Sequence, residues 1–544
     1  MTNLVKDLRK LLKDNNADAL LVNSTNEFLV EYNQLEFSSR YKLTGFSGSV
    51  GDALITKDKI YQFVDARYHE QADLEVNHNI VEVVKLQIGD SYLKKLVENL
   101  NDDSTLLLTG TKVSNYFYNT LKNELANKNI KIIALDVDPI VNSDFSKYKD
   151  IVYVPKNISG KTAKAKIAKI QKKLQDNDYI VVSSLEDIAY LTNLRSFDIP
   201  FSSFFYAKMI ISKDNAVLFT DYNVQNNYES IKILPLQSFK IELSKIKKSN
   251  LYIDTKTITI NDFEAINTSN TIKDSKIYLL KSKKNASEIK HIKTAFKRTD
   301  AALKIVEKML QENNEYSEKE IAQALEKCFY DNGARALSFK PIVAAGSNSS
   351  IIHYSSPSKD IIVKDGDFLL VDCGAYYEGG YATDITRTFI KGKPSKKQKK
   401  VYTTVLKAFF AAYKFSYKKN STWFDIDKKA RTTINNIDNK GYTFGHSTGH
   451  GVGVSVHEMP PAVAPSVISK TKIFKNAVFT IEPGIYKTGE GGVRLENTVY
   501  INSTSPKIKI ETLSKFKFEE KLIDYDMLNT KEKKWLKDWQ AMNE

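Results

Sequence analysis

Hydrophobic residues recur with helical spacing at the start of the chain and again after residue 285. The first predicted helix presents one apolar face, formed by Leu4, Val5, Leu8, Leu11 and Leu12. The second begins at Asn285, which can cap it, and Glu288 stands three residues later, where it can complete a capping box. Both segments therefore predict amphipathic helices that pack against a core.

The first half of the chain contains an internal repeat. Residues 8–27 and residues 170–187 each give an amphipathic pattern, an Asp/Asn turn and a short apolar run. Two α/β domains of one type in tandem explain this repeat. We expect an α/β (α+β) protein with three domains, which span residues 1–145, 155–283 and 285–544, the last ending in a helical tail.

Two predicted hairpins of the third domain carry acidic residues on otherwise apolar strands. The first has Asp372 at the end of one strand and Asp384 on the next, and the second carries Glu482 and Glu496. A buried charge costs several kcal/mol unless it is compensated. Four carboxylates that face one interior therefore predict bound cations.

Two divalent cations would balance these four carboxylates, and His450 can add a neutral nitrogen ligand. A donor set made mainly of oxygen favours manganese or a similar hard ion. Two ions about 3.5 to 4 Å apart can hold a shared hydroxide and polarise a carbonyl, which is hydrolase chemistry. Taken alone, Asp372 is more simply a turn former and Glu482 a strand end, so the prediction depends on their combination.

The stretch "GHSTGHGVGVSVHE" holds three of the seven histidines of the chain, His446, His450 and His457. Its glycines make a helix unfavourable. The segment also lacks the G-x-G-x-x-G spacing of a dinucleotide-binding loop. We therefore interpret it as a loop that brings histidines to the acidic hairpins.

Composition narrows the class of protein. The chain has 544 residues, 42% of them hydrophobic and 27% charged, and no apolar run approaches the roughly eighteen residues of a membrane span. The net charge of +15 comes from lysines spread along the chain and mixed with acids, which argues against nucleic-acid binding. Two cysteines give no disulfide framework. We expect a cytoplasmic protein without membrane or nucleic-acid partners.

Several motifs together resemble the catalytic domain of the pita-bread metallopeptidases, family M24, and among them the aminopeptidase P family of Xaa-Pro aminopeptidases. They are "IIHY", "VDCGAYYEGGYATDITRTF", "HSTGHGVGVSVHE", "TIEPGIY" and "GVRLENTVYI". The upstream stretches "RYKLTGFSGSVGDALIT", "FVDARY" and "LTNLRS" are similar to the two creatinase-type domains of the three-domain, cytosolic form. The resemblance covers essentially the whole chain.

The resemblance implies a role for each matching residue. The two metal ions, manganese in the typical case with cobalt or zinc as alternatives, would be bound by Asp372, Asp384, His450, Glu482 and Glu496. Contacts to the substrate and the tetrahedral intermediate would come from His353, His446 and His457, and Tyr486 matches an aromatic residue near the site. Glu482 would also carry a proton from the attacking water to the leaving amine.

Two arginines of the hairpins are expected to have different roles. Arg494 lies two residues before Glu496, on the same face of a strand. There it can steady a metal-bound carboxylate, and we also expect it to contribute to substrate binding. For Arg387 we predict a salt bridge that orders the first hairpin.

The resemblance implies hydrolysis of the N-terminal Xaa-Pro bond of peptides, and it implies a homodimer. A prolidase, which cleaves Xaa-Pro dipeptides, is the nearest alternative, but prolidases of this fold usually have one upstream domain. A non-enzymatic binding module and creatinase share the fold without metals. Both are disfavoured because all five ligand positions are filled here.

The spacing of the two aspartates departs from the family pattern. Eleven residues separate Asp372 from Asp384, where ten are expected. We expect the extra residue to lie at the tip of the turn, so that both aspartates face the site. A register shift would instead move one of them away.

Overall fold

The computed structural model describes residues 2–87, 89–145, 147–268, 270–272, 277–312 and 314–543. It divides into two compact units. The first comprises Met1–Tyr153, Lys161–Pro200 and Phe204–Lys276, and the second Val154–Gly160, Phe201–Ser203 and Ile277–Glu544. In the described ranges, every helix is too short or too polar to cross a bilayer.

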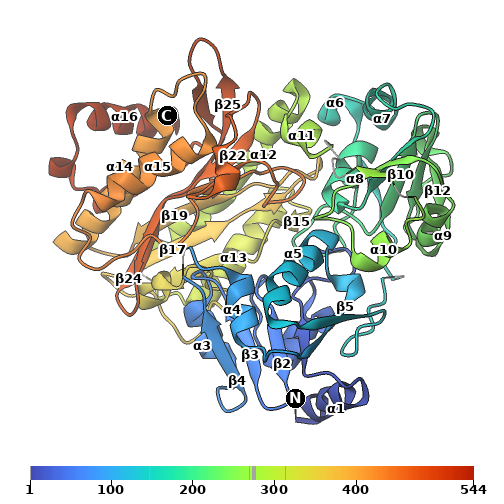
Figure 1. The fold of residues 1–544 in the computed structure, drawn as a ribbon. Coiled ribbons are helices and arrows are strands. Elements are labelled where there is room, and N and C mark those ends of the chain that lie inside the picture. Colours follow the sequence, from blue (N-terminus) through green and yellow to red (C-terminus); the bar gives the residue numbers. More distant parts are fainter. Residues whose placement is uncertain are drawn as a thin grey trace. The chain divides into compact units, whose positions relative to one another are not determined.

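The first unit contains two six-stranded sheets with the same topology (Figure 1). The first sheet has the order β4 (Val81–Lys85), β3 (Ile60–Val64), β2 (Ala53–Thr56), β1 (Ala19–Val22), β5 (Thr105–Thr109) and β6 (Lys131–Leu135). The second has the order β12 (Lys232–Leu234), β11 (Ala216–Phe219), β10 (Lys208–Ser212), β8 (Asp178–Val182), β13 (Asn250–Tyr252) and β14 (Asn270–Ile272). Parallel and antiparallel pairs occur in the same order in both sheets. The predicted tandem of two like α/β domains is confirmed.

Helices cover these sheets with their apolar faces. In α1 (Thr2–Asp14) the predicted face is present, and Leu8 and Leu12 are fully buried. The other helices of this unit are α2 (Ser39–Thr44), α3 (His69–Glu75), α4 (Tyr92–Glu98), α5 (Asn115–Leu125), α7 (Ala163–Gln171), α8 (Leu185–Thr192), α9 (Phe239–Ser244) and α10 (Ile260–Glu264). A two-residue ladder joins β7 (Val152–Tyr153) to β9 (Leu194–Arg195).

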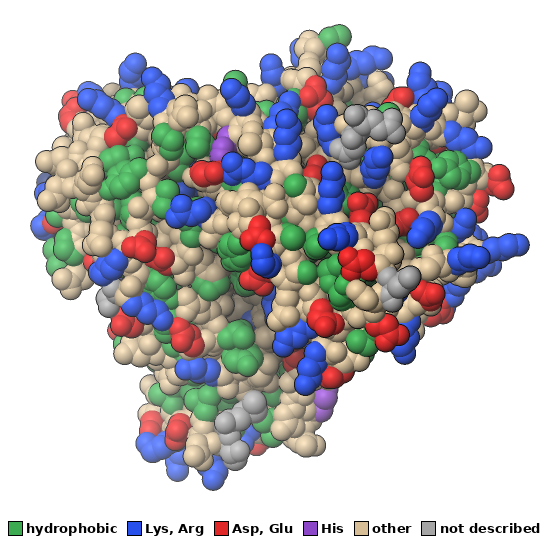
Figure 2. Space-filling model, turned by 180° about the vertical axis from the view of Figure 1, so that it is seen from behind, with side chains coloured by type: hydrophobic (Ala, Val, Ile, Leu, Met, Phe, Trp, Pro, Cys, Tyr) green, Lys and Arg blue, Asp and Glu red, His purple; other side chains and the backbone are tan. Residues whose placement is uncertain are grey.

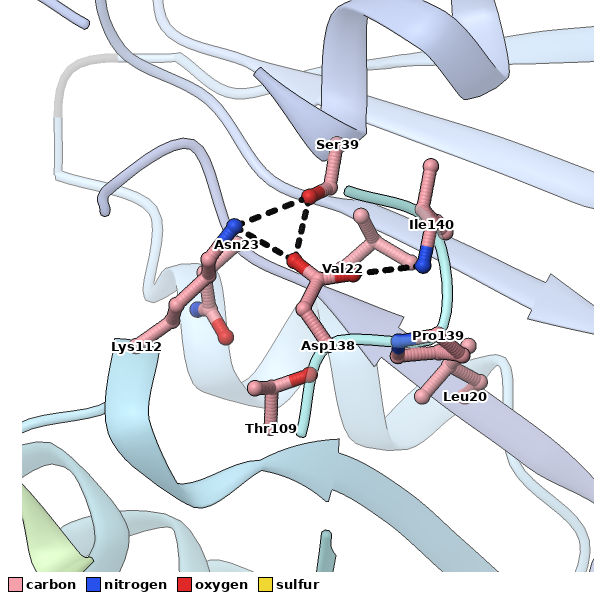
Figure 3. Close-up of a pocket in the computed structure, with 9 residues that line it drawn as sticks. All are labelled: Leu20, Val22, Asn23, Ser39, Thr109, Lys112, Asp138, Pro139 and Ile140. Carbon is pink, nitrogen blue, oxygen red and sulfur yellow. Dashed lines mark hydrogen bonds and ion pairs between the residues drawn. The ribbon is translucent and has the colours of Figure 1, made fainter. Parts of the chain in front are cut away.

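A small pocket lies where β1 and β5 of the first sheet end (Figure 3). In open α/β sheets this edge is a common ligand position. Here Lys112 forms an ion pair with Asp138 and donates to Ser39 Oγ over 3.1 Å, while Asp138 Oδ1 accepts the Ile140 N–H over 2.7 Å. The polar groups of Lys112 and Asp138 that line the pocket thus bind each other and neighbouring residues of the protein.

The second unit contains two helix pairs and several short antiparallel sheets. Its helices are α6 (Lys156–Ser159), α11 (Ile277–Ser282), α12 (Ala286–Gln311), α13 (Glu318–Asp331), α14 (Lys396–Lys414), α15 (Trp423–Asn435) and α16 (Thr530–Gln540). Its strands are β15 (Ala336–Leu337), β16 (Ile342–Ala345), β17 (Phe368–Cys373), β18 (Ala375–Tyr376), β19 (Ile385–Ile390), β20 (Gly449–His450), β21 (Ala462–Val463), β22 (Val478–Ile481), β23 (Gly484–Lys487), β24 (Gly491–Arg494), β25 (Asn497–Ser503) and β26 (Lys509–Thr512).

Each helix pair of the second unit shares a hydrophobic core with one sheet. Residues of α12 and α13 pack with the sheet β16-β17-β19, and residues of α14 and α15 pack with the sheet β22-β25-β26. The start of α12 is the predicted one, because Asn285 Oδ1 accepts the Glu288 N–H over 3.1 Å and Glu288 completes the capping box. The four acidic residues lie on or next to the strands of these two sheets: Asp372 on β17, Asp384 just before β19, Glu482 just after β22 and Glu496 just before β25.

Arg387 on β19 is fully buried. Its guanidinium donates to the carbonyl oxygens of Thr386, Glu496, Phe516 and Lys517 and to Oδ1 of Asn497. Within the described residues its partners are thus amide oxygens, and the predicted salt bridge is wrong. Arg387 still orders the hairpin, and burial lowers its pKa to about 10.

Basic side chains are interspersed with acidic ones across the face shown in Figure 2. This distribution matches the lysine pattern of the sequence, in which basic and acidic residues are mixed.

Candidate metal centre

The first acidic hairpin brings both aspartates to one face. Strands β17 and β19 pair antiparallel with Asp372 opposite Thr386. The same register continues through the bridge between Tyr376 and Ala382, so the tip of the longer connection lies at residues 377–381. The extra residue leaves the register intact, as we expected, and both aspartates stay on the site face.

Gly374 lies in the paired part of this hairpin, two residues after Asp372. A Cβ at this position would lie 1.9 Å from the carbonyl oxygen of Thr383, a distance that no side chain tolerates. Only glycine allows the two strands to approach this closely beside the aspartates.

The second acidic hairpin is interrupted at its glutamates. We expected two continuous strands, but each is divided, with Glu482 between β22 and β23 and Glu496 between β24 and β25. The register is the same before and after the break, so the two glutamates lie opposite each other. Their backbone N–H groups bond to other segments instead, Glu482 to the Thr448 carbonyl (2.8 Å) and Glu496 to the Thr386 carbonyl (3.1 Å).

His450 reaches the carboxylates from β20. Gly449 lets this strand lie against β22, because a Cβ there would be 2.0 Å from the Thr480 carbonyl oxygen. His450 Nδ1 lies 3.1 Å from the Gly451 carbonyl oxygen, which can only accept a hydrogen bond. His450 Nε2 is therefore left as the ring acceptor, 3.4 Å from Glu482 Oε1 and 3.6 Å from Asp384 Oδ2.

The donor atoms fit divalent metal ions. Asp384, His450 and Glu496 each offer one ligand atom, and these atoms lie within 4.8 Å of one another. Glu482 Oε1 lies 3.4 Å from His450 of this cluster, and Asp372 is close enough to raise the pKa values of Asp384 and Glu496. Among the described residues, buried Asp372 Oδ1 has no hydrogen-bond partner, which is costly for a carboxylate unless a cation lies nearby. An oxygen-rich set with one imidazole suits a hard ion.

The protein environment raises the pKa values of three carboxyl groups of the centre, those of Asp384, Glu482 and Glu496. Burial, followed by repulsion from the neighbouring carboxylates, raises the pKa of Asp384 and of Glu496 well above the ordinary range. Burial raises the pKa of Glu482 to about 7, although Arg494 opposes this shift. A cation close to these carboxyl groups would therefore favour their ionised form.

Arg494 connects three parts of the centre. Its Nη2 donates to Asp372 Oδ2 over 2.6 Å and its Nη1 to the Tyr486 hydroxyl over 2.8 Å. Its Nε donates to Thr386 Oγ1 over 3.2 Å, and this hydroxyl donates to Glu496 Oε2 over 2.8 Å. The guanidinium thus orients two carboxylates and the tyrosine at once.

His446 and Tyr486 form a fixed pair beside Glu482. His446 Nδ1 lies 2.8 Å from the Ser447 carbonyl oxygen and 3.9 Å from Glu482 Oε2. His446 Nε2 lies 2.9 Å from the Tyr486 hydroxyl, which already accepts a hydrogen bond from Arg494.

The other two predicted substrate histidines lie next to these groups. The His457 ring packs edge-on against the His450 ring, with 4.5 Å between centroids. His353 is partly buried and follows Ile352, whose carbonyl oxygen accepts a hydrogen bond from Arg494 Nη1 over 3.3 Å.

Several supporting residues were not identified from the sequence. Thr480 Oγ1 donates to Glu482 Oε1 over 3.2 Å, and Thr386 does the same for Glu496. Thr480 lies two residues before Glu482 and Thr386 two residues after Asp384, and this period-two spacing in extended chain could have indicated a shared face. Asp427 on α15, which accepts the Thr448 hydroxyl over 2.7 Å, gives no such signal because its partner is distant in sequence.

Comparison with known proteins supports this organisation. The model of metallopeptidase family M24 matches residues 290–503, and two models of the creatinase/prolidase N-terminal domain match residues 5–142 and 145–288. The chain is 29% identical to "Xaa-Pro aminopeptidase 1" of Dictyostelium discoideum over 98% of its length and 91% of the relative's. It is 30% identical to "Probable Xaa-Pro aminopeptidase P" of Coprinopsis cinerea, covering 98% and 93%.

Solved structures show the same fold. The X-prolyl aminopeptidase of Caenorhabditis elegans, described as a cytosolic enzyme with a di-nuclear active site, superposes with a TM-score of 0.90 and 22% identity. That match covers 99% of this chain and 95% of the other. The prolidase of Pyrococcus horikoshii gives a TM-score of 0.53 at 29% identity, covering 66% of this chain and 99% of that one. The predicted fold, two creatinase-type domains followed by a pita-bread domain, is confirmed, whereas its exact boundaries stay a prediction.

Proposed function

The chain belongs to metallopeptidase family M24, and from this membership we propose that it hydrolyses the N-terminal Xaa-Pro bond of peptides with a dinuclear metal centre. One observation carries the proposal, namely the convergence of Asp372, Asp384, His450, Glu482 and Glu496 in a chain that aligns over nearly its whole length with Xaa-Pro aminopeptidases.

We propose that these five residues hold two divalent ions, manganese first, with cobalt or zinc as alternatives. The donor chemistry supports a hard ion, and Asp372 Oδ1 is a buried acceptor without a hydrogen-bond partner in the part of the chain that the structure describes. Ions held by these residues would supply Lewis-acid chemistry, namely activation of a water molecule as nucleophile and polarisation of the carbonyl of the scissile bond.

His446, His457 and Tyr486 are proposed to face the substrate. The Tyr486 hydroxyl, held by Arg494, and the imidazole of His446 meet at 2.9 Å beside Glu482. When His446 Nε2 carries a proton it donates to the Tyr486 hydroxyl, and the hydroxyl proton can then be donated where negative charge develops on the carbonyl oxygen. His457, whose ring packs against the His450 ring, is proposed to donate a hydrogen bond to the substrate as well.

Glu482 is proposed to move the proton from the attacking water to the leaving amine. One of its oxygens lies 3.4 Å from His450 and the other 3.9 Å from His446, so it reaches from the ligand group to the proposed substrate side. His353, next to the Ile352 carbonyl that Arg494 holds, is proposed to contact the substrate.

The Xaa-Pro bond is a tertiary amide, which explains why a dedicated enzyme is needed. Proline fixes φ and lacks an N–H, so peptidases that require a secondary amide accommodate it poorly.

Prolidase activity on Xaa-Pro dipeptides is the second candidate, favoured by the 29% identity to the Pyrococcus horikoshii prolidase. That protein, however, matches only 66% of this chain, whereas the Xaa-Pro aminopeptidases match 98%.

The deciding experiment compares an Xaa-Pro-Yaa tripeptide with the corresponding Xaa-Pro dipeptide. We expect cleavage of the tripeptide, its loss after thorough chelation and its return with added manganese. Preference for the dipeptide would favour the prolidase, and activity that survives metal removal would refute the dinuclear mechanism.

Location and assembly remain proposals as well. The two cysteines, Cys328 and Cys373, are free thiols, which agrees with a cytosolic protein. The homodimer stays a prediction, and sedimentation of the purified protein tests it.

A further inference from the structure

Glu318, the first residue of α13, is a fully buried carboxylate outside the metal centre. It accepts four hydrogen bonds. Oε1 receives the Ala345 N–H over 2.8 Å and the Asn348 side-chain amide over 3.0 Å. Oε2 receives the Tyr354 hydroxyl over 2.7 Å and the Ser358 N–H over 3.0 Å.

These four donors all belong to one segment, residues 345–358, which leaves β16 and includes the 3₁₀ turn Gly346–Ser350. His353 lies inside this segment, between Asn348 and Tyr354. One carboxylate therefore anchors the chain on both sides of the histidine, including the residue that directly follows it. A carboxylate is the only side chain that offers enough acceptors for two donors on each oxygen.

The same segment is also tied to the metal centre. Arg494 donates to the carbonyl oxygen of Ile352 over 3.3 Å and to Asp372 over 2.6 Å, and Ser349 Oγ accepts the Gly492 N–H over 2.9 Å. The loop is thus held by Glu318 on α13 at its ends and by β24 near its middle. His353 lies where these two restraints meet.

We propose that Glu318 is a positioning residue that sets His353 for substrate contact by fixing both flanks of its loop. The inference rests on the proposed function, because it takes His353 to face the peptide. Glu318 acts through the loop, since its hydrogen bonds go to residues 345–358 and not to the five proposed metal ligands.

Glu318→Gln tests the proposal with little change in size. An amide has one acceptor oxygen, so its NH₂ must face either the Ala345 and Asn348 pair or the Tyr354 and Ser358 pair. One buried backbone N–H then loses its partner, and the loop must shift. We expect kcat/KM on an Xaa-Pro-Yaa tripeptide to fall about 10²-fold, with bound metal unchanged.

A matched control lies two residues away in the same helical turn. Glu320 is exposed and completes the capping box with Ser317, a role that glutamine also fills. Glu320→Gln makes the same chemical change, and we expect wild-type kinetics.

A double-mutant cycle with His353→Ala separates positioning from a merely structural role. If Glu318 acts through His353, the double variant Glu318→Gln/His353→Ala loses no more activity than His353→Ala alone, within about twofold. Multiplied losses in the double variant overturn the inference while leaving the peptidase assignment intact. A wild-type protein that cleaves no Xaa-Pro peptide overturns both.

Tyr354→Phe keeps the test decisive if Glu318→Gln does not fold. It removes one donor to Glu318 and leaves both backbone bonds in place. We expect a smaller loss of kcat/KM in the same direction, again absent in the His353→Ala background. Unchanged kinetics in this folded variant count against the proposal.

Discussion

Metal-free protein should become less stable as the pH rises through the range in which Glu482 titrates. Burial raises the pKa of Glu482 from 4.5 to about 7. At about 1.4 kcal/mol per pKa unit, ionised Glu482 costs the folded state about 3 kcal/mol above pH 7. Between pH 5.5 and 7 Glu482 keeps about one proton in the folded state that it loses in the unfolded state, so this residue alone should lower the stability by about 2 kcal/mol. Asp384 and Glu496, whose pKa values are also raised, add to this fall.

Bound metal should reverse this trend. The ligands must lose their protons to bind a cation, so the stabilisation by manganese should grow as the pH rises. The difference in stability between loaded and metal-free protein should therefore be larger at pH 8 than at pH 5.5.

Tryptophan fluorescence isolates the relevant part of the molecule. All three tryptophans, Trp423, Trp535 and Trp539, lie in the second unit, so urea unfolding followed at this signal reports the unit that holds the carboxylates. The matched control is Glu482→Gln, which cannot titrate. If metal-free wild type and Glu482→Gln show the same slope of stability against pH, the assignment of the perturbed group is wrong.

Two further substitutions test the geometry of the centre. Arg494→Lys keeps the charge but loses the planar group that joins Asp372 to Tyr486, so we expect kcat/KM with the tripeptide to fall about 10- to 100-fold. Full activity would count against the orienting role of Arg494. Gly449→Ala would bring Cβ 2.0 Å from the Thr480 carbonyl oxygen, and we expect loss of bound metal by elemental analysis. In the control Gly366→Ala the added Cβ would meet nothing within 4 Å, and the strain of its positive φ (+89°) falls in the turn before β17, so this variant should retain metal; equal metal content in both variants would contradict this account.

The sequence predicted those features that depend on local pattern. The capping box at Asn285 and Glu288 needs only residues three apart, and the apolar runs beside Asp372 and Asp384 are visible within a few residues. The tandem sheets of the first unit followed from a repeat of the same kind. In each case the information that determines the structure lies close together in the chain.

The features that the sequence did not reveal depend on contacts between distant segments. The break at Glu482 forms because its N–H bonds to the Thr448 carbonyl, and this requires β20 to lie against β22. Likewise Arg387 was expected to find a carboxylate, but four carbonyl oxygens surround it, which no local pattern records. Buried arginines satisfy any nearby acceptors, and tertiary packing decides which ones are present.

The structure also changes the charge balance on which the two-metal hypothesis was based. Four ionised carboxylates were matched with two dications, but Arg494, fully buried and 2.6 Å from Asp372, adds one positive charge to the same interior. One dication would then leave the group at minus one, and two would leave it at plus one. Two dications with one hydroxide would make the group neutral, and so would one dication with one carboxyl group protonated, a state that the raised pKa values of Asp384 and Glu496 favour. The arginine that orients Asp372 therefore lowers from four to three the negative charges that bound cations have to balance, whatever number of ions binds.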